Sequence, residues 1–104
     1  MATFKKIPKR LTQREIKAGL KSLKGWHYVP KQKAISIECK LKDFMAVVRE
    51  IQKIAKFAEK ANHHPDLHLT GYRHLKIVLR SHDAGGVTEK DFSLAKQINI
   101  KASN

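Results

Sequence analysis

Histidine side chains gather in one part of this sequence. Every histidine except His27 lies in the span from His63 to His82, at spacings that repeat neither a helix nor a strand. Carboxylates flank the span, with Glu59 before it and Asp91 after it. Imidazole exchanges protons near neutral pH, so histidines beside carboxylates are typical of general acid–base catalysis. We therefore interpret this stretch as a candidate site and the remaining chain as its scaffold.

Three of these histidines are placed where they could act on a ligand. His63 and His64 directly follow the C-terminal end of a long predicted helix, and Glu59 lies four residues before His63. A spacing of four brings two residues to one helix face, so we expect Glu59 to orient the His63 ring as the carboxylate of a catalytic triad does. His82 lies at a predicted strand end, before a Gly85-Gly86 turn that lets the backbone approach a ligand closely.

Each candidate also has a structural alternative. His63 could cap the carbonyls of the helix, His64 could be a turn residue before a proline, and His82 could end a strand. Asp91 stands three residues after Thr88, which is the spacing of a capping box at a helix start. Both interpretations stay open at this point, because the residue types and spacings satisfy either.

Two other chemistries fit the sequence less well. A metal site needs a set of ligands, but Pro65 separates His64 from His68 and disfavours the helix that would align them. The single cysteine, Cys39, offers no second thiolate, and no nucleophile elbow surrounds a serine. We therefore expect neither a bound metal nor a covalent nucleophile.

Length and composition predict an ordinary small domain. The chain has 104 residues, of which 41% are hydrophobic, so we expect one domain over residues 11–104, preceded by a flexible basic arm over residues 1–10. No apolar run is long enough to cross a membrane, and a lone cysteine fits a reducing compartment. These features predict a cytoplasmic protein, with the nucleus and the mitochondrion as alternatives.

The charge of the chain is unusual. It carries 22 lysines and arginines against nine acidic residues, a net charge of +13. A field of this sign attracts polyanions. The basic residues are nevertheless spread out, without the interleaved aromatic residues that are typical of single-stranded nucleic-acid surfaces. A solvated basic surface is the interpretation we favour, and binding of nucleic acid or of an acidic partner is the alternative.

Periodicity predicts three helices and four strands. Apolar residues repeat at helical spacing in three segments, two of which begin with a capping box at Thr12 and Thr88, and they alternate in strand-like segments. The predicted helices span residues 12–24, 41–61 and 88–100, and the predicted strands span residues 26–29, 34–39, 66–70 and 73–81. Because short turns join the strands in pairs, we expect an α+β domain with a mostly antiparallel sheet and helices on one face.

The helix predicted over residues 41–61 is apolar around about half of its circumference. This arc, which includes Phe44, Val48 and Ile51, is wider than the ~100° stripe that one packing partner needs. We infer that the helix packs on the sheet and also on a second subunit.

A longer pattern contains all of the candidate residues. It consists of Glu59-x3-His63-His64-Pro65, Tyr72, His82 and the helix start Gly86-Val-Thr-Glu-Lys-Asp91, with Gly25-Trp26 and Leu94-Ala95 as further matches. This pattern resembles that of the pterin-4a-carbinolamine dehydratases, and the resemblance extends over about residues 11–100.

The resemblance implies a fold and a reaction. Members of that family have a four-stranded antiparallel sheet with three helices on one face, and they assemble as homodimers or homotetramers. They dehydrate 4a-hydroxytetrahydropterin to quinonoid dihydropterin, which recycles the tetrahydrobiopterin spent by aromatic amino acid hydroxylases. They use neither a metal nor a cofactor, so we expect none here.

The resemblance also implies roles for the candidate residues. His63 and His82 are the expected acid–base pair, His64 is expected to bind and orient the pterin, and Glu59 is expected to orient the histidines. The expected substrate-binding positions are Tyr72, Ser81 and Asp91.

The sequence departs from the family pattern just before the last catalytic histidine. Arg80 and Ser81 stand where the pattern leads us to expect a Ser-Thr-like pair before His82. Some animal members also stabilise the dimer of a homeodomain transcription factor. Such a non-catalytic binding role is the alternative function, and it would involve the basic surface around Arg49, Lys53 and Lys56.

Overall fold

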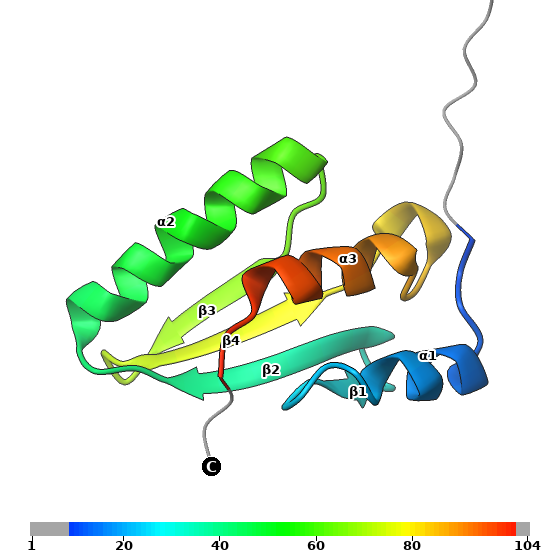
Figure 1. The fold of residues 1–104 in the computed structure, drawn as a ribbon, viewed down its shortest axis with the longest axis horizontal. Coiled ribbons are helices and arrows are strands. Elements are labelled where there is room, and N and C mark those ends of the chain that lie inside the picture. Colours follow the sequence, from blue (N-terminus) through cyan, green and yellow to red (C-terminus); the bar gives the residue numbers. More distant parts are fainter. Residues whose placement is uncertain (1–8, 102–104) are drawn as a thin grey trace, which may run out of the picture.

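The structure is a computed structural model, and it describes residues 9–101. Most of the predicted basic arm, residues 1–8, lies outside the described residues. The elements are α1 (Gln13–Leu20), β1 (His27–Val29), β2 (Ala34–Lys40), α2 (Phe44–Ala61), β3 (Asp66–Thr70), β4 (His74–Leu79), the 3-10 turn η1 (His82–Ala84) and α3 (Glu89–Ile98) (Figure 1). The predicted order of helices and strands is confirmed, and η1 is an addition that the sequence did not predict.

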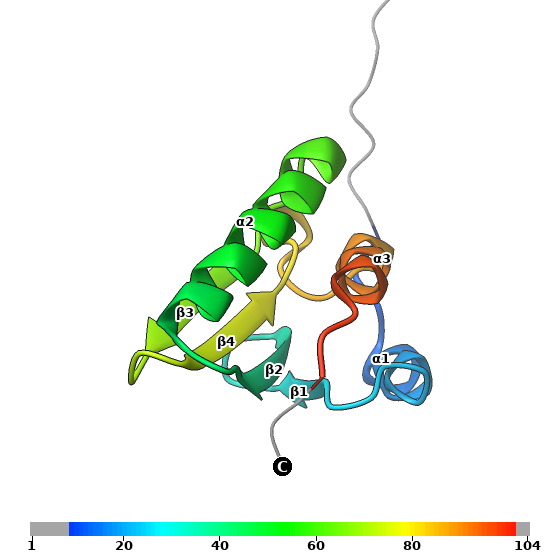
Figure 2. The same cartoon turned by 60° about the vertical axis from the view of Figure 1, so that its left-hand side comes forward.

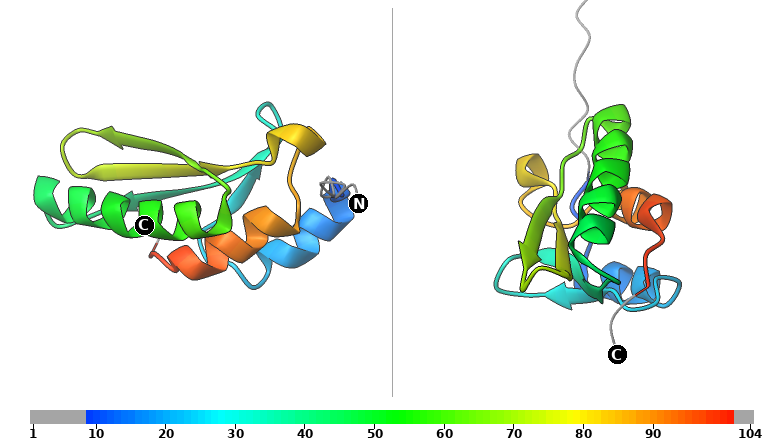
Figure 3. Two further views of the ribbon diagram at one scale, coloured as in Figure 1. Left: turned by 90° about the horizontal axis from the view of Figure 1, so that it is seen from above. Right: turned by 90° about the vertical axis from the view of Figure 1, so that its left-hand side faces the viewer.

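The four strands form one antiparallel sheet in the order β1-β2-β4-β3. In the central pair, Ile37 lies opposite Ile77, and both side chains are fully buried. Seen from above, all three helices lie on the same side of the sheet (Figure 3). The predicted α+β architecture, with its three helices on one face, is therefore confirmed.

The core lies between this sheet and the helices. Ile54 of α2 and Ile98 of α3 are fully buried within it. Figure 2 shows α1 and α3 nearly end-on, with α3 next to both other helices. Close packing of α1 on α3 depends on Gly19, because a Cβ atom there would lie 2.7 Å from the Phe92 ring. This contact fixes α3, whose first turn carries Asp91.

The two predicted capping boxes are present. The side chain of Thr12 accepts a hydrogen bond from the amide of Glu15, and the Glu15 carboxylate accepts one from the amide of Thr12. Thr88 and Asp91 make the same reciprocal arrangement at the start of α3. The start of α2 was predicted too early, at residue 41. It begins after Asp43, whose carboxylate caps the amide of Ala46 at 2.8 Å.

The first helix is shorter than predicted. We expected it to continue to Lys24, but α1 ends at Leu20, and successive tight turns follow it. Leu23 and Trp26 nevertheless bury their side chains. Apolar spacing therefore identified the buried residues correctly, although the backbone between them is not helical.

The outer side of α2 remains exposed in the single chain. The side chains of Phe44 and Met45 are 49% and 55% exposed, whereas Val47, Ile54 and Ala58 on the inner side are buried.

Within residues 9–101, no helix is both long and apolar enough to cross a membrane.

Candidate active site

The end of α2 places His63 at the edge of the core. Asn62 adopts the left-handed conformation and turns the chain away from the helix axis. The amide of His63 then donates to the carbonyl of Ala58 at 3.1 Å, which is the pattern of a Schellman ending. The His63 side chain consequently points back towards α3, and only 12% of its surface is exposed.

The His63 ring meets the carboxylate of Asp91. Its Nε2 atom lies 2.5 Å from Oδ1 of Asp91, and the Asp91 side chain is completely buried. An ionised carboxylate has no proton to donate, so the ring must donate to it. In the neutral ring, Nε2 therefore carries the proton and Nδ1 is left with a lone pair.

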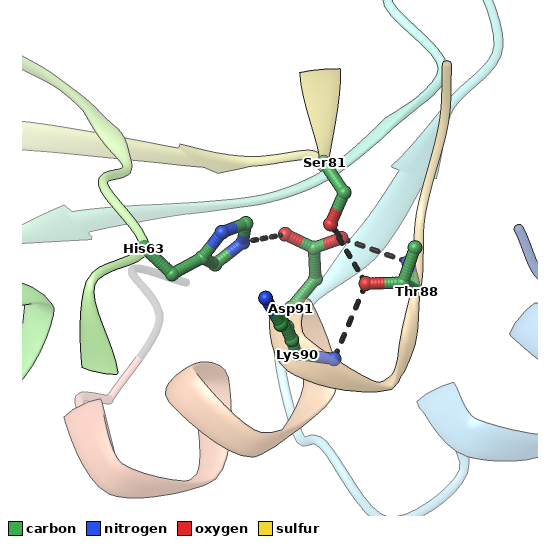
Figure 4. A network of polar contacts seen from close by, with 5 residues as sticks. All are labelled: His63, Ser81, Thr88, Lys90 and Asp91. Carbon is green, nitrogen blue, oxygen red and sulfur yellow. Dashed lines mark hydrogen bonds and ion pairs between the residues drawn. The ribbon is translucent and has the colours of Figure 1, made fainter. Parts of the chain in front are cut away.

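Asp91 is held by hydrogen bonds to its other oxygen. Oδ2 accepts from the Ser81 hydroxyl at 2.9 Å and from the amide of Thr88 at 2.8 Å, and the hydroxyls of Ser81 and Thr88 lie 2.7 Å apart (Figure 4). Ser81, Thr88 and Asp91 are all buried. Low local dielectric strengthens hydrogen bonds in such a network. Asp91 is thus a fixed anchor for the His63 ring.

Glu59 contacts a different histidine from the one that its spacing predicted. We expected Glu59 to orient His63, but its Oε2 atom lies 2.5 Å from Nε2 of His64. The reason is the left-handed turn at Asn62, which ends the helix before His63 and removes it from the helix face that carries Glu59. The pair is open to solvent, with His64 57% and Glu59 76% exposed.

His82 lies in η1, directly after the buried Ser81. Its side chain is exposed, and its Nδ1 atom lies 3.2 Å from a guanidinium nitrogen of Arg80. Because Ser81 bonds to Asp91 and Asp91 contacts His63, the network joins the two chain segments that carry the expected acid–base pair.

Three expected substrate contacts have other positions. Tyr72 is in the turn at the far end of the β3–β4 hairpin, whereas His63 precedes β3 and His82 follows β4. Ser81 and Asp91 are 1% and 0% exposed, and both belong to the network that supports His63 from inside. The expected substrate-binding roles of Tyr72, Ser81 and Asp91 stay predictions, and in the single chain Ser81 and Asp91 have a second role as buried support for His63.

The Gly85-Gly86 turn lies close to Arg10. Gly85 has a φ of +69°, which a side chain would strain. A Cβ atom on Gly86 would lie 2.9 Å from Cδ of Arg10. Arg10, which we expected to belong to the flexible arm, therefore packs closely against this turn.

Two hollows of the surface lie away from the histidines. One, of about 670 Å³, lies between the segment after α1 and the C-terminal end of α3, and the other, of about 360 Å³, lies around Arg10, Pro30 and Gly85. Among the described residues, no group of three or more histidine, cysteine or acidic side chains is arranged to hold a metal ion. In the candidate site itself, His64 and His82 are exposed and His63 is largely buried.

The sequence of this chain matches a family of known proteins. The profile of the family described as Pterin 4 alpha carbinolamine dehydratase matches residues 9–100. The chain belongs to this family. The predicted family is confirmed by this match, which includes every residue of the polar network described above.

Relatives and a solved structure of the family are similar over almost their whole length. A protein of Koribacter versatilis named "Putative pterin-4-alpha-carbinolamine dehydratase" is 40% identical over 95 residues, which are 89% of this chain and 96% of the relative. A protein of Sulfolobus acidocaldarius with the same name is 40% identical over 90 residues, or 86% of this chain and 96% of the relative. The crystal structure of a transcriptional coactivator/pterin dehydratase from Brucella melitensis matches with a TM-score of 0.83 at 35% identity, covering 91% of this chain and 100% of that chain.

Sequence reasoning missed two parts of this dehydratase-family site. The contact between His63 and Asp91 joins residues 28 positions apart, and no local spacing predicts it. Thr88 was identified as a helix cap, but not as a partner of Ser81. The available signal was the capping box itself, because a carboxylate at the third helical position has its second oxygen free for another donor.

Proposed function

We propose that this chain dehydrates 4a-hydroxytetrahydropterin to quinonoid dihydropterin, in the recycling of tetrahydrobiopterin. His63 and His82 act as the acid–base pair, His64 orients the pterin, and Glu59 orients His64. The observation that supports this most directly is the 2.5 Å contact between Nε2 of His63 and the buried carboxylate of Asp91. It leaves Nδ1 of His63 as the nitrogen available to a substrate.

The reaction requires two proton movements. Hydroxide is a poor leaving group at C4a, so the departing oxygen must receive a proton while N5 loses one. A well-placed acid or base contributes about 10²–10⁴-fold to such a step. A ring held by a fixed carboxylate has a defined tautomer and orientation, which is the role of the aspartate in catalytic triads. His63 has that environment here.

Stopped-flow absorbance with freshly generated 4a-hydroxytetrahydropterin tests this proposal. We expect the wild-type chain to accelerate dehydration, and we expect His63→Ala and His82→Ala each to lower kcat by about 10²-fold or more. His68→Ala is the matched control, because His68 is an exposed histidine in the middle of β3. Unchanged turnover in both folded site variants would remove these histidines from the mechanism.

A second candidate function comes from the Brucella protein, which is described as a transcriptional coactivator as well as a pterin dehydratase. In the present chain, the exposed side of α2 carries Arg49, Lys53 and Lys56. This surface would suit an acidic partner protein or a nucleic acid. Such binding would survive His63→Ala and His82→Ala, but would be lost when the three basic residues are replaced by glutamine.

We also propose that the chain forms a homodimer or homotetramer in the cytoplasm. Phe44 and Met45 would be covered by a second copy, because about half of each side chain is exposed in the single chain. Light scattering at micromolar concentration tests the assembly. A monomer that retains full dehydratase activity would contradict it.

A further inference from the structure

Arg80 joins His82 to the turn between β1 and β2. One guanidinium nitrogen, Nη1, donates to the carbonyl of Gln32 at 3.3 Å, and the other, Nη2, lies 3.2 Å from Nδ1 of His82. Two anchors on different segments hold the guanidinium in one place. The His82 ring, although exposed, thus has a defined neighbour at one of its nitrogens.

The direction of the hydrogen bond to His82 follows from the chemistry of arginine. A guanidinium has five donors and no acceptor, so Nδ1 of His82 must accept. A nitrogen that accepts has a lone pair, and the proton of the neutral ring is then on Nε2. An imidazolium ring has no lone pair to offer, so the contact with Arg80 exists only when His82 is neutral.

We propose that Arg80 is a positioning residue that holds His82 in the neutral tautomer with the proton on Nε2. His82 then presents an N–H group, and not a lone pair, to whatever binds at the site. This inference rests on the proposed dehydratase function for its catalytic meaning, but the tautomer itself is a property of the free protein. Arg80 would have this effect without touching the substrate.

The rings of His63 and His82 offer different groups to a substrate, a lone pair in one case and an N–H in the other, and this assigns a different role to each. The anionic Asp91 accepts from Nε2 of His63 and leaves a lone pair on Nδ1, whereas the cationic Arg80 donates to Nδ1 of His82 and leaves an N–H on Nε2. His63 is therefore the proton acceptor for N5, and His82 is the hydrogen-bond donor to the 4a-hydroxyl. Their roles are not interchangeable.

The step balances with these roles. The N5–H proton passes to Nδ1 of His63, the electron pair that it leaves forms the C4a=N5 double bond, and the C4a–O bond breaks. The oxygen of the breaking bond accepts a hydrogen bond from the Nε2–H of His82 and takes the proton that His63 accepted, so it leaves as water. Both histidines then return to their starting forms without an oxidant or a reductant.

The tautomer is measured first. Two-dimensional ¹H–¹⁵N spectra of the histidine rings distinguish a protonated ring nitrogen from one with a lone pair, and His82→Gln assigns the signals of His82. In mildly alkaline solution we expect wild-type His82 to be protonated at Nε2 alone. In Arg80→Ser we expect a mixture of both tautomers, because a serine hydroxyl can donate or accept.

Dehydration kinetics are measured on the same variants. We expect Arg80→Ser to lower kcat roughly 10-fold with little change in KM, because part of the molecules would present the wrong ring nitrogen to the hydroxyl. Arg80→Lys keeps a donor-only cation and should restore part of both the tautomer and kcat. Lys76→Ser is the matched control, since it removes one positive charge from β4, the strand that directly precedes Arg80, without a contact to His82. It should behave as the wild type.

The two measurements separate the inference from the proposed function. If wild-type His82 has its proton on Nδ1, or if Arg80→Ser leaves the tautomer unchanged, the inference is overturned whatever the activity. If the tautomer responds to Arg80 but the wild type does not dehydrate the pterin, the proposed function fails and the positioning role of Arg80 stands. If Lys76→Ser lowers kcat as much as Arg80→Ser, the effect comes from charge alone and the inference is again overturned.

Discussion

His63 and Asp91 meet through a 2.5 Å contact between Nε2 and Oδ1, although 28 residues separate them in the chain. His63 comes from the end of α2, and Asp91 comes from the first turn of α3. The contact therefore ties two helices together at the point where the candidate chemistry takes place. Its geometry is secured from the Asp91 side, where Ser81 and Thr88 occupy the second oxygen.

Asp91→Asn tests the importance of the carboxylate. The single oxygen of asparagine can still accept from Ser81 and from the Thr88 amide, so the amide NH₂ group would face His63. That group donates, which would force the proton of the His63 ring from Nε2 to Nδ1. We expect kcat to fall by about 10²-fold or more in a folded protein. Stopped-flow dehydration and circular dichroism measure the two properties, and full activity of this variant would contradict the orienting role.

Ser81→Ala removes one donor from the buried Asp91 carboxylate and leaves the Thr88 hydroxyl without its side-chain partner. An unsatisfied buried polar group costs about 1–3 kcal/mol. We expect the free energy of unfolding, measured by urea denaturation, to fall by that amount. Ser93→Ala on the exposed side of α3 is the control, and it should change stability by less than about 0.5 kcal/mol. Equal effects of the two substitutions would argue against the network.

Gly19→Ala tests the packing of α1 on α3. Alanine has the higher helix propensity, by about 1 kcal/mol, but its Cβ atom would lie 2.7 Å from the Phe92 ring. We expect the steric strain to exceed the gain in helix propensity, so the variant should lose about 1–3 kcal/mol of stability. The double variant with Phe92→Leu should recover part of that loss in thermal unfolding. A stabilised Gly19→Ala single variant would show that α1 can move away from α3.

Because the thiol of Cys39 is buried, we expect the folded protein to lose stability at alkaline pH. Burial, and secondarily the charge of Glu50, raises the pKa of its thiol to about 11 from an ordinary value of 9.0. The thiol ionises more easily in the unfolded chain, so its contribution to stability is complete below pH 9 and is lost as the pH rises towards 11. Urea denaturation of wild type and Cys39→Ala over this range should show a steeper decline for the wild type. A thiol reagent should label Cys39 only upon unfolding.

The fold was largely predictable because its signals are local. Capping boxes at Thr12 and Thr88 and alternating apolar residues in the strands each involve neighbours in the chain. The errors arose where the backbone departs from regular geometry. The left-handed residue Asn62 ended α2 before His63, and tight turns replaced the predicted last turns of α1. Single residues decide such breaks, and periodicity does not detect them.

The site was predictable in its residue types but not in its pairings. Sequence spacing identified the histidines and Asp91, and it paired Glu59 with the wrong histidine. Whether Ser81 and Tyr72 face a ligand depends on tertiary position. Ser81 is buried under α3, and Tyr72 is at the opposite end of a hairpin. Neither the burial of Ser81 nor the position of Tyr72 can be predicted from the neighbouring residues in the sequence.

The double use of Asp91 has a consequence for evolution. One oxygen contacts His63 and the other completes the capping box of α3, so selection for a stable fold alone would retain this aspartate in a descendant that had lost turnover. His82 is exposed and is free of such a structural duty. When genomes are searched for family members that have abandoned dehydration, loss of His82 should therefore be the informative sign, and presence of Asp91 should carry little weight.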